Sequence, residues 1–187
     1  METRTQHSEY IKEKYSTYDN GLYWIWSDVG RGKTESLRTC NQEAILCSRS
    51  NENRHTILCC GSNELGIQIH YRHPDIIKDI HLLNPTSSRV KKKGWKDFEG
   101  FVNYESFYRL QERLSIPHFL VIDEPAQLWK QASSYHPEKT NYDWFRHYLE
   151  NVPVVIFLGY DDPHYILEEL EEISQIRGDN FLQIRYV

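Results

Sequence analysis

Lys33 and Thr34 are the first residues that could do chemistry, because they end a glycine-bearing turn after the apolar run at residues 22–26. Backbone N–H groups in such a turn can wrap a phosphate at the positive end of a helix. Lys33 would then reach the outer phosphates of a nucleotide, and the Thr34 hydroxyl would bind Mg²⁺. The expected phosphate-binding residues are Ser27, Gly30, Arg31, Gly32, Lys33 and Thr34.

This turn differs from the usual phosphate-binding pattern G-x-x-x-x-G-K-[ST] at its first position, where Ser27 stands in place of glycine. Gly30 can supply part of the missing backbone freedom. An exposed glycine-rich turn between a strand and a helix stays open as an alternative for Gly-Lys-Thr alone. A second motif is therefore needed.

Asp123 and Glu124 supply that motif, because they end the apolar run at residues 119–122. Such a run is typical of a parallel strand buried on both faces, and ligands of open α/β sheets lie at the carboxyl ends of such strands. Asp123 would bind Mg²⁺, and Glu124 would orient or deprotonate an attacking water. A simple polar turn, which Asp-Glu-Pro also favours, is the alternative.

Strand and helix patterns alternate along the chain, which predicts an α/β fold in three layers with a mainly parallel central sheet. Strands are expected at residues 21–26, 55–61, 101–102, 119–124, 152–158 and 181–187. Helices are expected at residues 33–48, 62–69, 74–83, 104–110, 126–129, 142–150 and 166–176. At residues 66–71 the apolar alternation leaves a strand open as the alternative.

Composition predicts one folded domain at residues 21–187 after a polar N-terminal extension at residues 1–20, whose tyrosines indicate a short helix. The chain has 187 residues, of which 39% are hydrophobic and 13% aromatic. No apolar run approaches the length of a membrane span, and the N-terminus lacks the form of a signal peptide. We expect a soluble, intracellular protein that has no membrane partner.

The net charge of −5 gives no global attraction for nucleic acid, so nucleic-acid binding would need a local basic patch. Lys91, Lys92, Lys93 and Lys96 form the one dense patch, in a polar stretch expected to be a loop at residues 84–100. A solvated charged loop is the alternative. The four cysteines lack paired metal-binding spacing and are expected to be ordinary buried thiols.

The motifs, taken in order, resemble those of the first RecA-like domain of superfamily-two helicases and translocases. The series comprises residues 30–35, 56–68, 101–107, 121–124 and 155–161, and the resemblance covers roughly residues 20–187. Within the superfamily the chain is most similar to viral origin-binding replication helicases. The resemblance implies a RecA-like P-loop NTPase fold and Mg²⁺-dependent ATP hydrolysis by a helicase in DNA replication, in the host cytoplasm or nucleus.

The resemblance also implies partners and further site residues. Single-stranded DNA would contact Ser62, Asn63, Asn103 and Tyr104, and hydrolysis would be coupled to strand movement at Gly159, Tyr160 and Asp161. Catalysis would need an arginine from a second RecA-like domain or a neighbouring subunit. If a neighbouring chain supplies it, the candidates are Arg146, Arg177 and Arg185.

Two other classes of protein stay open. The first is another P-loop enzyme, either a viral DNA-packaging ATPase or a nucleoside kinase, in which an acidic pair also ends a strand. The second is a non-catalytic nucleotide-binding module, which the serine at the first position of the phosphate turn favours.

Overall fold

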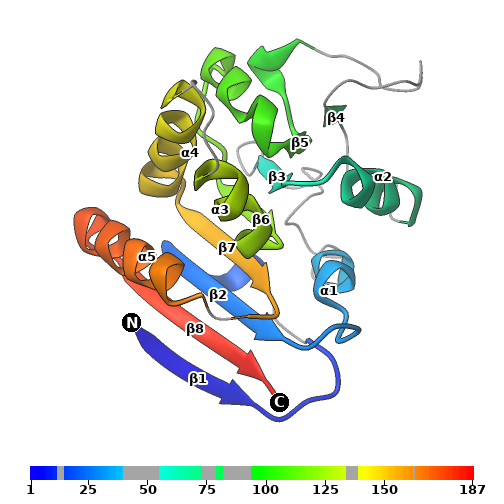
Figure 1. Ribbon diagram of the computed structural model, residues 1–187, viewed down its shortest axis with the longest axis vertical. Helices are drawn as coiled ribbons and strands as arrows, with labels where there is room; N and C mark the ends of the chain where they lie inside the picture. Colours follow the sequence, from blue (N-terminus) through cyan, green and yellow to red (C-terminus); the bar gives the residue numbers. More distant parts are fainter. Residues whose placement is uncertain (12–14, 40–54, 73–78, 82–93, 134–138, 162) are drawn as a thin grey trace.

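The structure is a computed structural model that describes residues 1–11, 15–39, 55–72, 79–81, 94–133, 139–161 and 163–187 (Figure 1). Its strands are β1 (Glu2–Gln6), β2 (Gly21–Ser27), β3 (Thr56–Cys60), β4 (Asp79–His81), β5 (Gly100–Asn103), β6 (Phe119–Asp123), β7 (Val154–Gly159) and β8 (Asn180–Tyr186). Its α-helices are α1 (Lys33–Thr39), α2 (Asn63–Arg72), α3 (Pro125–Ser133), α4 (Lys139–Asn151) and α5 (His164–Arg177). Its 3₁₀ helices are η1 (Tyr15–Thr17), η3 (Trp95–Asp97) and η4 (Tyr104–Glu112).

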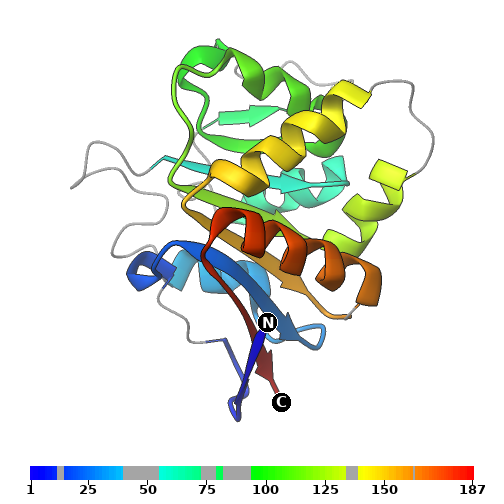
Figure 2. The ribbon, with the colours of Figure 1, turned by 90° about the vertical axis from the view of Figure 1, so that its left-hand side faces the viewer.

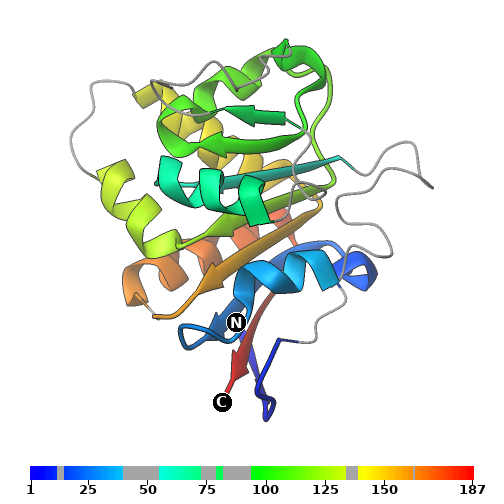
Figure 3. The ribbon, with the colours of Figure 1, turned by 90° about the vertical axis from the view of Figure 1, so that its right-hand side faces the viewer.

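The strands form one sheet of eight in the order β1-β8-β2-β7-β6-β3-β5-β4, and every pairing is parallel. Helices α3, α4 and α5 cover one face (Figure 2), and α1 and α2 cover the other (Figure 3). The predicted three-layer α/β fold is confirmed. No helix in the described ranges has the length and apolar character that crossing a bilayer requires.

The central strands are buried on both faces because their apolar runs are continuous. In β2, Leu22 and Trp24 belong to the core under α3, α4 and α5, whereas Ile25 belongs to the core under α1 and α2. Cys59 and Cys60 face opposite cores in the same way, and both are buried free thiols as predicted. Burial raises the pKa of both thiols, that of Cys60 to about 12. The other two cysteines lie outside the described residues.

The helix preferred at residues 62–69 is confirmed by α2. The helix predicted at residues 74–83 is wrong at Asp79–His81, because these residues pair with β5 as strand β4. The polar N-terminal segment forms the edge strand β1, whose side chains are mostly exposed and which pairs with β8. The tyrosine-rich stretch that follows contains only the short 3₁₀ helix η1 in its described part.

Because all strands run in the same direction, their carboxyl ends meet at one edge of the sheet. Five of these ends succeed one another along the edge, in the order β2, β7, β6, β3 and β5. The sheet thereby brings five motifs that are distant in the sequence into one row. Neighbouring strands are about 5 Å apart, so the two predicted catalytic motifs, after β2 and β6, are separated by one intervening strand end.

Candidate functional site

The turn after β2 has the backbone shape expected of a phosphate cradle. Gly30 and Gly32 have φ angles of 85° and 76°, in the left-handed region that glycine adopts without steric cost. The Arg31 N–H donates to the Asp28 carbonyl at 3.4 Å, and the Ser36 N–H donates to the Gly32 carbonyl at 2.7 Å. The turn is therefore closed by one backbone bond and leads directly into the first turn of α1.

Lys33 lies over this turn. Its Nζ donates to the carbonyl oxygens of Ser27 at 2.9 Å and Asp28 at 3.0 Å. Ser27 is fully buried, and its Oγ lies 3.5 Å from Lys33 Nζ, so the turn accommodates serine at the position of the first glycine. Thr34 follows Lys33 in α1, and its side chain lies outside the described part of the structure.

The acidic pair sits at the tip of β6 with an unusual backbone. Asp123 is buried, and the Glu124 N–H donates both to Asp123 Oδ1 and to the Leu158 carbonyl of β7, each at 3.1 Å. Glu124 has a φ of 53° and is the one non-glycine residue of the described chain with a positive φ. Such strain costs about 1–3 kcal/mol and is concentrated at functional sites. Pro125 opens α3 at the first helical position, where its missing N–H costs nothing.

Lys33 of the glycine turn interacts electrostatically with the acidic pair at the tip of β6. Partial burial lowers the pKa of Lys33, while the carboxylates of Asp123, Asp28 and Glu124 act in the opposite direction. The lysine ammonium therefore lies within the field of both members of the acidic pair. The phosphates of a ligand bound at the turn would lie near the positive charge of Lys33 and near the carboxylates of Asp123 and Glu124.

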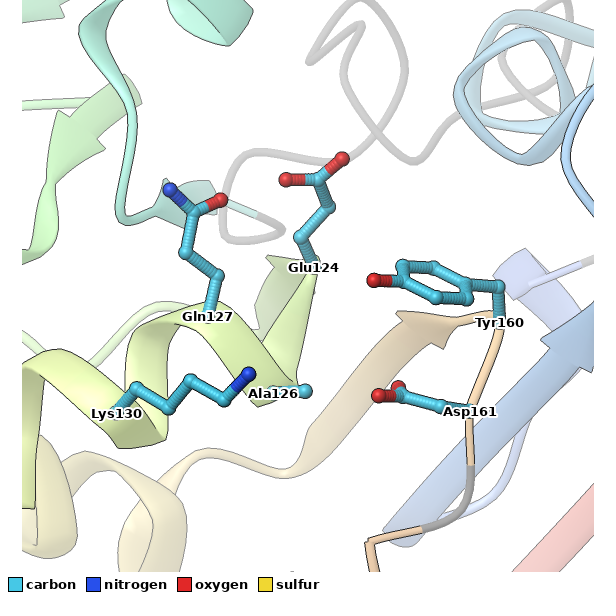
Figure 4. Close-up of a pocket in the computed structure, with 6 residues that line it drawn as sticks. All are labelled: Glu124, Ala126, Gln127, Lys130, Tyr160 and Asp161. Carbon is cyan, nitrogen blue, oxygen red and sulfur yellow. The ribbon is translucent and has the colours of Figure 1, made fainter.

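A small cleft of about 230 Å³ adjoins Glu124, between the start of α3 and the end of β7 (Figure 4). Gly159 ends β7 in a buried position, whereas Tyr160 is half exposed. Lys130 and Asp161 extend toward one another across this cleft. The predicted coupling residues thus lie directly beside the predicted catalytic base. The cleft is lined by Glu124, Ala126, Gln127, Lys130, Tyr160 and Asp161.

The two segments predicted to contact nucleic acid lie together at the ends of β3 and β5. Asn103 Nδ2 donates to Asn63 Oδ1 at 3.0 Å, which joins the two strand ends. Ser62 and Asn63 are partly exposed, but Asn103 is buried. The ring of Tyr104 is 4% exposed and packs edge-on against Phe145 at 5.4 Å between centroids. Tyr104 therefore anchors the segment in the core.

The remaining basic residues predicted to contact nucleic acid or phosphate are the lysine patch and Arg31. Lys91, Lys92 and Lys93 lie outside the described residues, and Lys96 is exposed in η3. Arg31 was expected to bind phosphate, but its Nη1 donates to the carbonyl oxygens of Ser8 at 3.2 Å and Glu9 at 3.5 Å. Its guanidinium therefore holds the N-terminal segment against the turn after β2, and its contact with phosphate stays a prediction.

Three arginines were candidates for supply to a neighbouring chain. Arg177 Nη1 donates to the carbonyls of Leu149 and Val152, and its side chain is 5% exposed. Arg146 bridges α4 and α5 through Glu150 and Glu172. Both are held by their own chain. Arg185 lies on β8 with its guanidinium carbon 5.9 Å from the centre of the Trp26 ring.

Sequence reasoning missed two contributors to this edge. Tyr10 is 55% exposed, and its ring lies beside Gly32, 3.8 Å from where a Cβ on that glycine would stand. Gln131 of α3 donates from Nε2 to the Gly61 carbonyl at 2.7 Å, which links the helix after the acidic pair to the segment before Asn63. The tyrosine cluster near the N-terminus was a signal for the first residue, whereas no motif marks the second.

No family model and no curated protein matches the sequence. Several solved structures are similar to this chain, among them the following two. A DEAD box protein from the hyperthermophile Methanococcus jannaschii has a TM-score of 0.62 and 14% identity over 92% of this chain and 47% of that chain. The Hef helicase domain of Pyrococcus furiosus has a TM-score of 0.54 and 17% identity over 92% of this chain and 36% of that chain.

These likenesses define the fold as that of the RecA-like domains of helicases, as the sequence predicted. The chain spans less than half the length of either protein.

Proposed function

We propose that this chain binds ATP and Mg²⁺ at the edge formed by the ends of β2, β7 and β6, and hydrolyses ATP as the motor domain of a nucleic-acid helicase or translocase. The observation that carries the proposal is the convergence of Lys33 with Asp123 and Glu124 at one sheet edge. A strained Glu124 beside a glycine turn is also what a preorganised hydrolytic site needs.

Each residue then has a distinct role. The backbone of the turn and Lys33 hold the β- and γ-phosphates, and Glu124 orients the attacking water or accepts its proton. Asp123 and the Thr34 hydroxyl hold Mg²⁺, which neutralises the charge that develops on the phosphates. Asp123 fits this role because Mg²⁺ prefers one or two protein carboxylates together with phosphates and waters.

The partner in this proposal is single-stranded DNA, and the process is DNA replication, as in the viral helicases that the sequence resembles. Support for a nucleic-acid partner comes from Ser62 and Asn63, which are partly exposed. They follow β3, the strand next to β6 of the proposed nucleotide site. The amide bond between Asn63 and Asn103 holds the segments in a fixed relation. A strand lying along these ends would contact the same edge that holds ATP.

The arginine that completes the site comes, in this proposal, from a second RecA-like domain or a neighbouring subunit. The internal bonds of Arg146 and Arg177 hold both guanidinium groups within this chain, which favours a second RecA-like domain over a second copy of this chain as the source. We therefore expect slow ATP hydrolysis by this chain alone, and faster hydrolysis when the second component is present.

Hydrolysis of ATP with Mg²⁺, measured with and without single-stranded DNA or RNA, tests the proposal. Stimulation by one nucleic acid supports a helicase-like motor and identifies that nucleic acid. Transfer of the γ-phosphate to a nucleoside would instead make the chain a kinase. Nucleotide binding without turnover, even with nucleic acid present, would make it a non-catalytic module. Either of the last two results overturns the proposed activity.

A further inference from the structure

We infer that Gln131 couples the nucleotide site to the Gly61–Asn63 segment, so that it acts as a positioning residue for the proposed activity. The inference rests on the proposed function and adds to it a specific route between the two halves of the edge. It begins at the backbone of Glu124, whose carbonyl accepts the N–H groups of Gln127 at 3.1 Å and Leu128 at 3.3 Å. Any displacement of Glu124 therefore moves the first turn of α3.

Helix α3 carries that displacement to Gln131. Residues 127 and 131 are four apart, so they lie on the same face of the helix one turn from each other. Gln127 lines the cleft beside Glu124, and Gln131 reaches Gly61. The strands beneath explain the contact, because β6 and β3 are paired neighbours, so that the helix after one lies beside the turn after the other.

The contact between Gln131 and Gly61 is close and specific. Nε2 donates to the Gly61 carbonyl at 2.7 Å. A Cβ on Gly61 would stand 2.7 Å from Gln131 Oε1 and 2.9 Å from Nε2, which is closer than unbonded atoms tolerate. Glycine is therefore required for the amide to sit against the backbone here.

The far end of the route is the predicted nucleic-acid segment itself. Gly61 is followed by Ser62 and Asn63, and Asn63 accepts the amide of Asn103. The contacts therefore run without a gap from Glu124 through α3 and Gln131 to the ends of β3 and β5, where nucleic acid is proposed to bind. Coupling along this route is a free energy between the two sites, which mutation of the intervening contact measures.

A double-mutant cycle tests the inference. Gln131→Leu keeps the size of the side chain and removes its donor, and Gly61→Ala displaces the amide. We expect each variant to retain basal ATP hydrolysis, with kcat and KM for ATP within about twofold of wild type. Each should lose stimulation by single-stranded DNA by about fivefold, the lower end of typical coupling between sites. The variant that combines Gly61→Ala with Gln131→Leu should lose no more stimulation than either single variant, because both changes break the same contact.

Gln175→Leu, at an exposed position of α5, is the matched control and should keep full stimulation. Thermal melting of each variant checks that the fold is retained. Additive losses in the double variant, or full stimulation in Gln131→Leu and Gly61→Ala, would overturn the inference and leave the proposed function standing.

Hydrogen exchange separates the inference from the proposed function. A non-hydrolysable ATP analogue with Mg²⁺ should slow amide exchange at residues 61–63 in the wild type but not in Gln131→Leu. If the analogue gives this pattern of protection but single-stranded DNA does not stimulate hydrolysis, the coupling through Gln131 stands and the proposed nucleic-acid partner is wrong. A wild-type protein that binds no nucleotide overturns both, and equal protection in wild type and Gln131→Leu overturns the route alone.

Discussion

The edge of the sheet has two halves that are built differently. The half formed by β2, β7 and β6 contains the charged side chains of Lys33, Asp123 and Glu124. Three of its residues have positive φ angles, namely Gly30, Gly32 and Glu124. In the half formed by β3 and β5, the described contacts are hydrogen bonds of amides, such as Asn103 to Asn63 and Gln131 to Gly61. None of residues 61–63 and 103–104 has a positive φ.

The difference indicates that the two halves of the edge have different functions. Charge and backbone strain are costly, so they persist where developing charge must be stabilised. Neutral amide contacts cost less and fix the relative positions of two segments without creating a strong field. We therefore expect changes in the first half to affect the chemical step, and changes in the second half to affect response to nucleic acid.

The largest effect is expected for Lys33→Ala. Loss of the ammonium should abolish measurable ATP hydrolysis and weaken nucleotide binding, because Lys33 Nζ lies against the carbonyls of the phosphate turn. The fold should be retained, because a partly exposed lysine in a turn contributes little to the core. Lys96→Ala, at an exposed position of η3, is the control. Equal ATP affinity and turnover in Lys33→Ala and wild type would remove the phosphate-cradle claim.

Glu124→Gln should give the next largest effect. The amide keeps the shape of the side chain but cannot accept a proton, so turnover should fall by about a hundredfold or more while ATP still binds. Rapid-quench measurement of hydrolysis, together with a binding titration, distinguishes these two steps. Full activity would place the catalytic base at another residue.

A moderate effect is expected for the lysine patch. The sequence alone predicts that these lysines contact nucleic acid. Lys91→Gln with Lys92→Gln should flatten the dependence of log affinity on log salt by about one to two units, because each phosphate contact releases about one counterion. Lys12→Gln with Lys14→Gln makes the same charge change elsewhere in the chain. Identical slopes for the two double variants would leave the patch as a solvated loop.

The smallest effect is expected on stability. Glu124→Gly and Glu124→Ala both lack the carboxylate, but only alanine keeps a Cβ at a φ of 53° in front of a proline. The glycine variant should be more stable by about 1 kcal/mol, the usual cost of the left-handed region. That difference corresponds to roughly 2–4 °C in melting temperature for a chain of this size. An alanine variant that melts at or above the glycine variant would contradict the strain at Glu124.

The sequence predicts the first half of the edge better than the second. Strands β2, β6 and β7 are continuous apolar runs, and the residues after β2 and β6 have types that suit phosphate and metal, so both motifs could be identified locally. Strand β1 was missed because its side chains are polar and mostly exposed, which leaves no alternation to detect. Strand β4 was mistaken for helix because the spacing of Ile76, Ile77 and Ile80 fits a helical face.

The contact between Gln131 and Gly61 could not be predicted, because it depends on which strands are neighbours. Nothing in residues 56–61 indicates that β3 pairs with β6, and a glutamine in a short helix has many possible partners. The role of Arg31 was hidden for the same reason, since its partners are backbone carbonyls of Ser8 and Glu9. Backbone acceptors occur at every residue and carry no signature in sequence.

The central claim is that the turn after β2 and the tip of β6 form one nucleotide site. A crystal structure with a non-hydrolysable ATP analogue and Mg²⁺ tests it most directly. The account predicts that Lys33 Nζ exchanges its bonds to Ser27 and Asp28 for phosphate oxygens at hydrogen-bond distance, about 3 Å. It also predicts the metal beside Asp123, with Glu124 facing the γ-phosphate. A nucleotide bound elsewhere, or phosphates that contact neither Lys33 nor the metal at Asp123, would contradict the account.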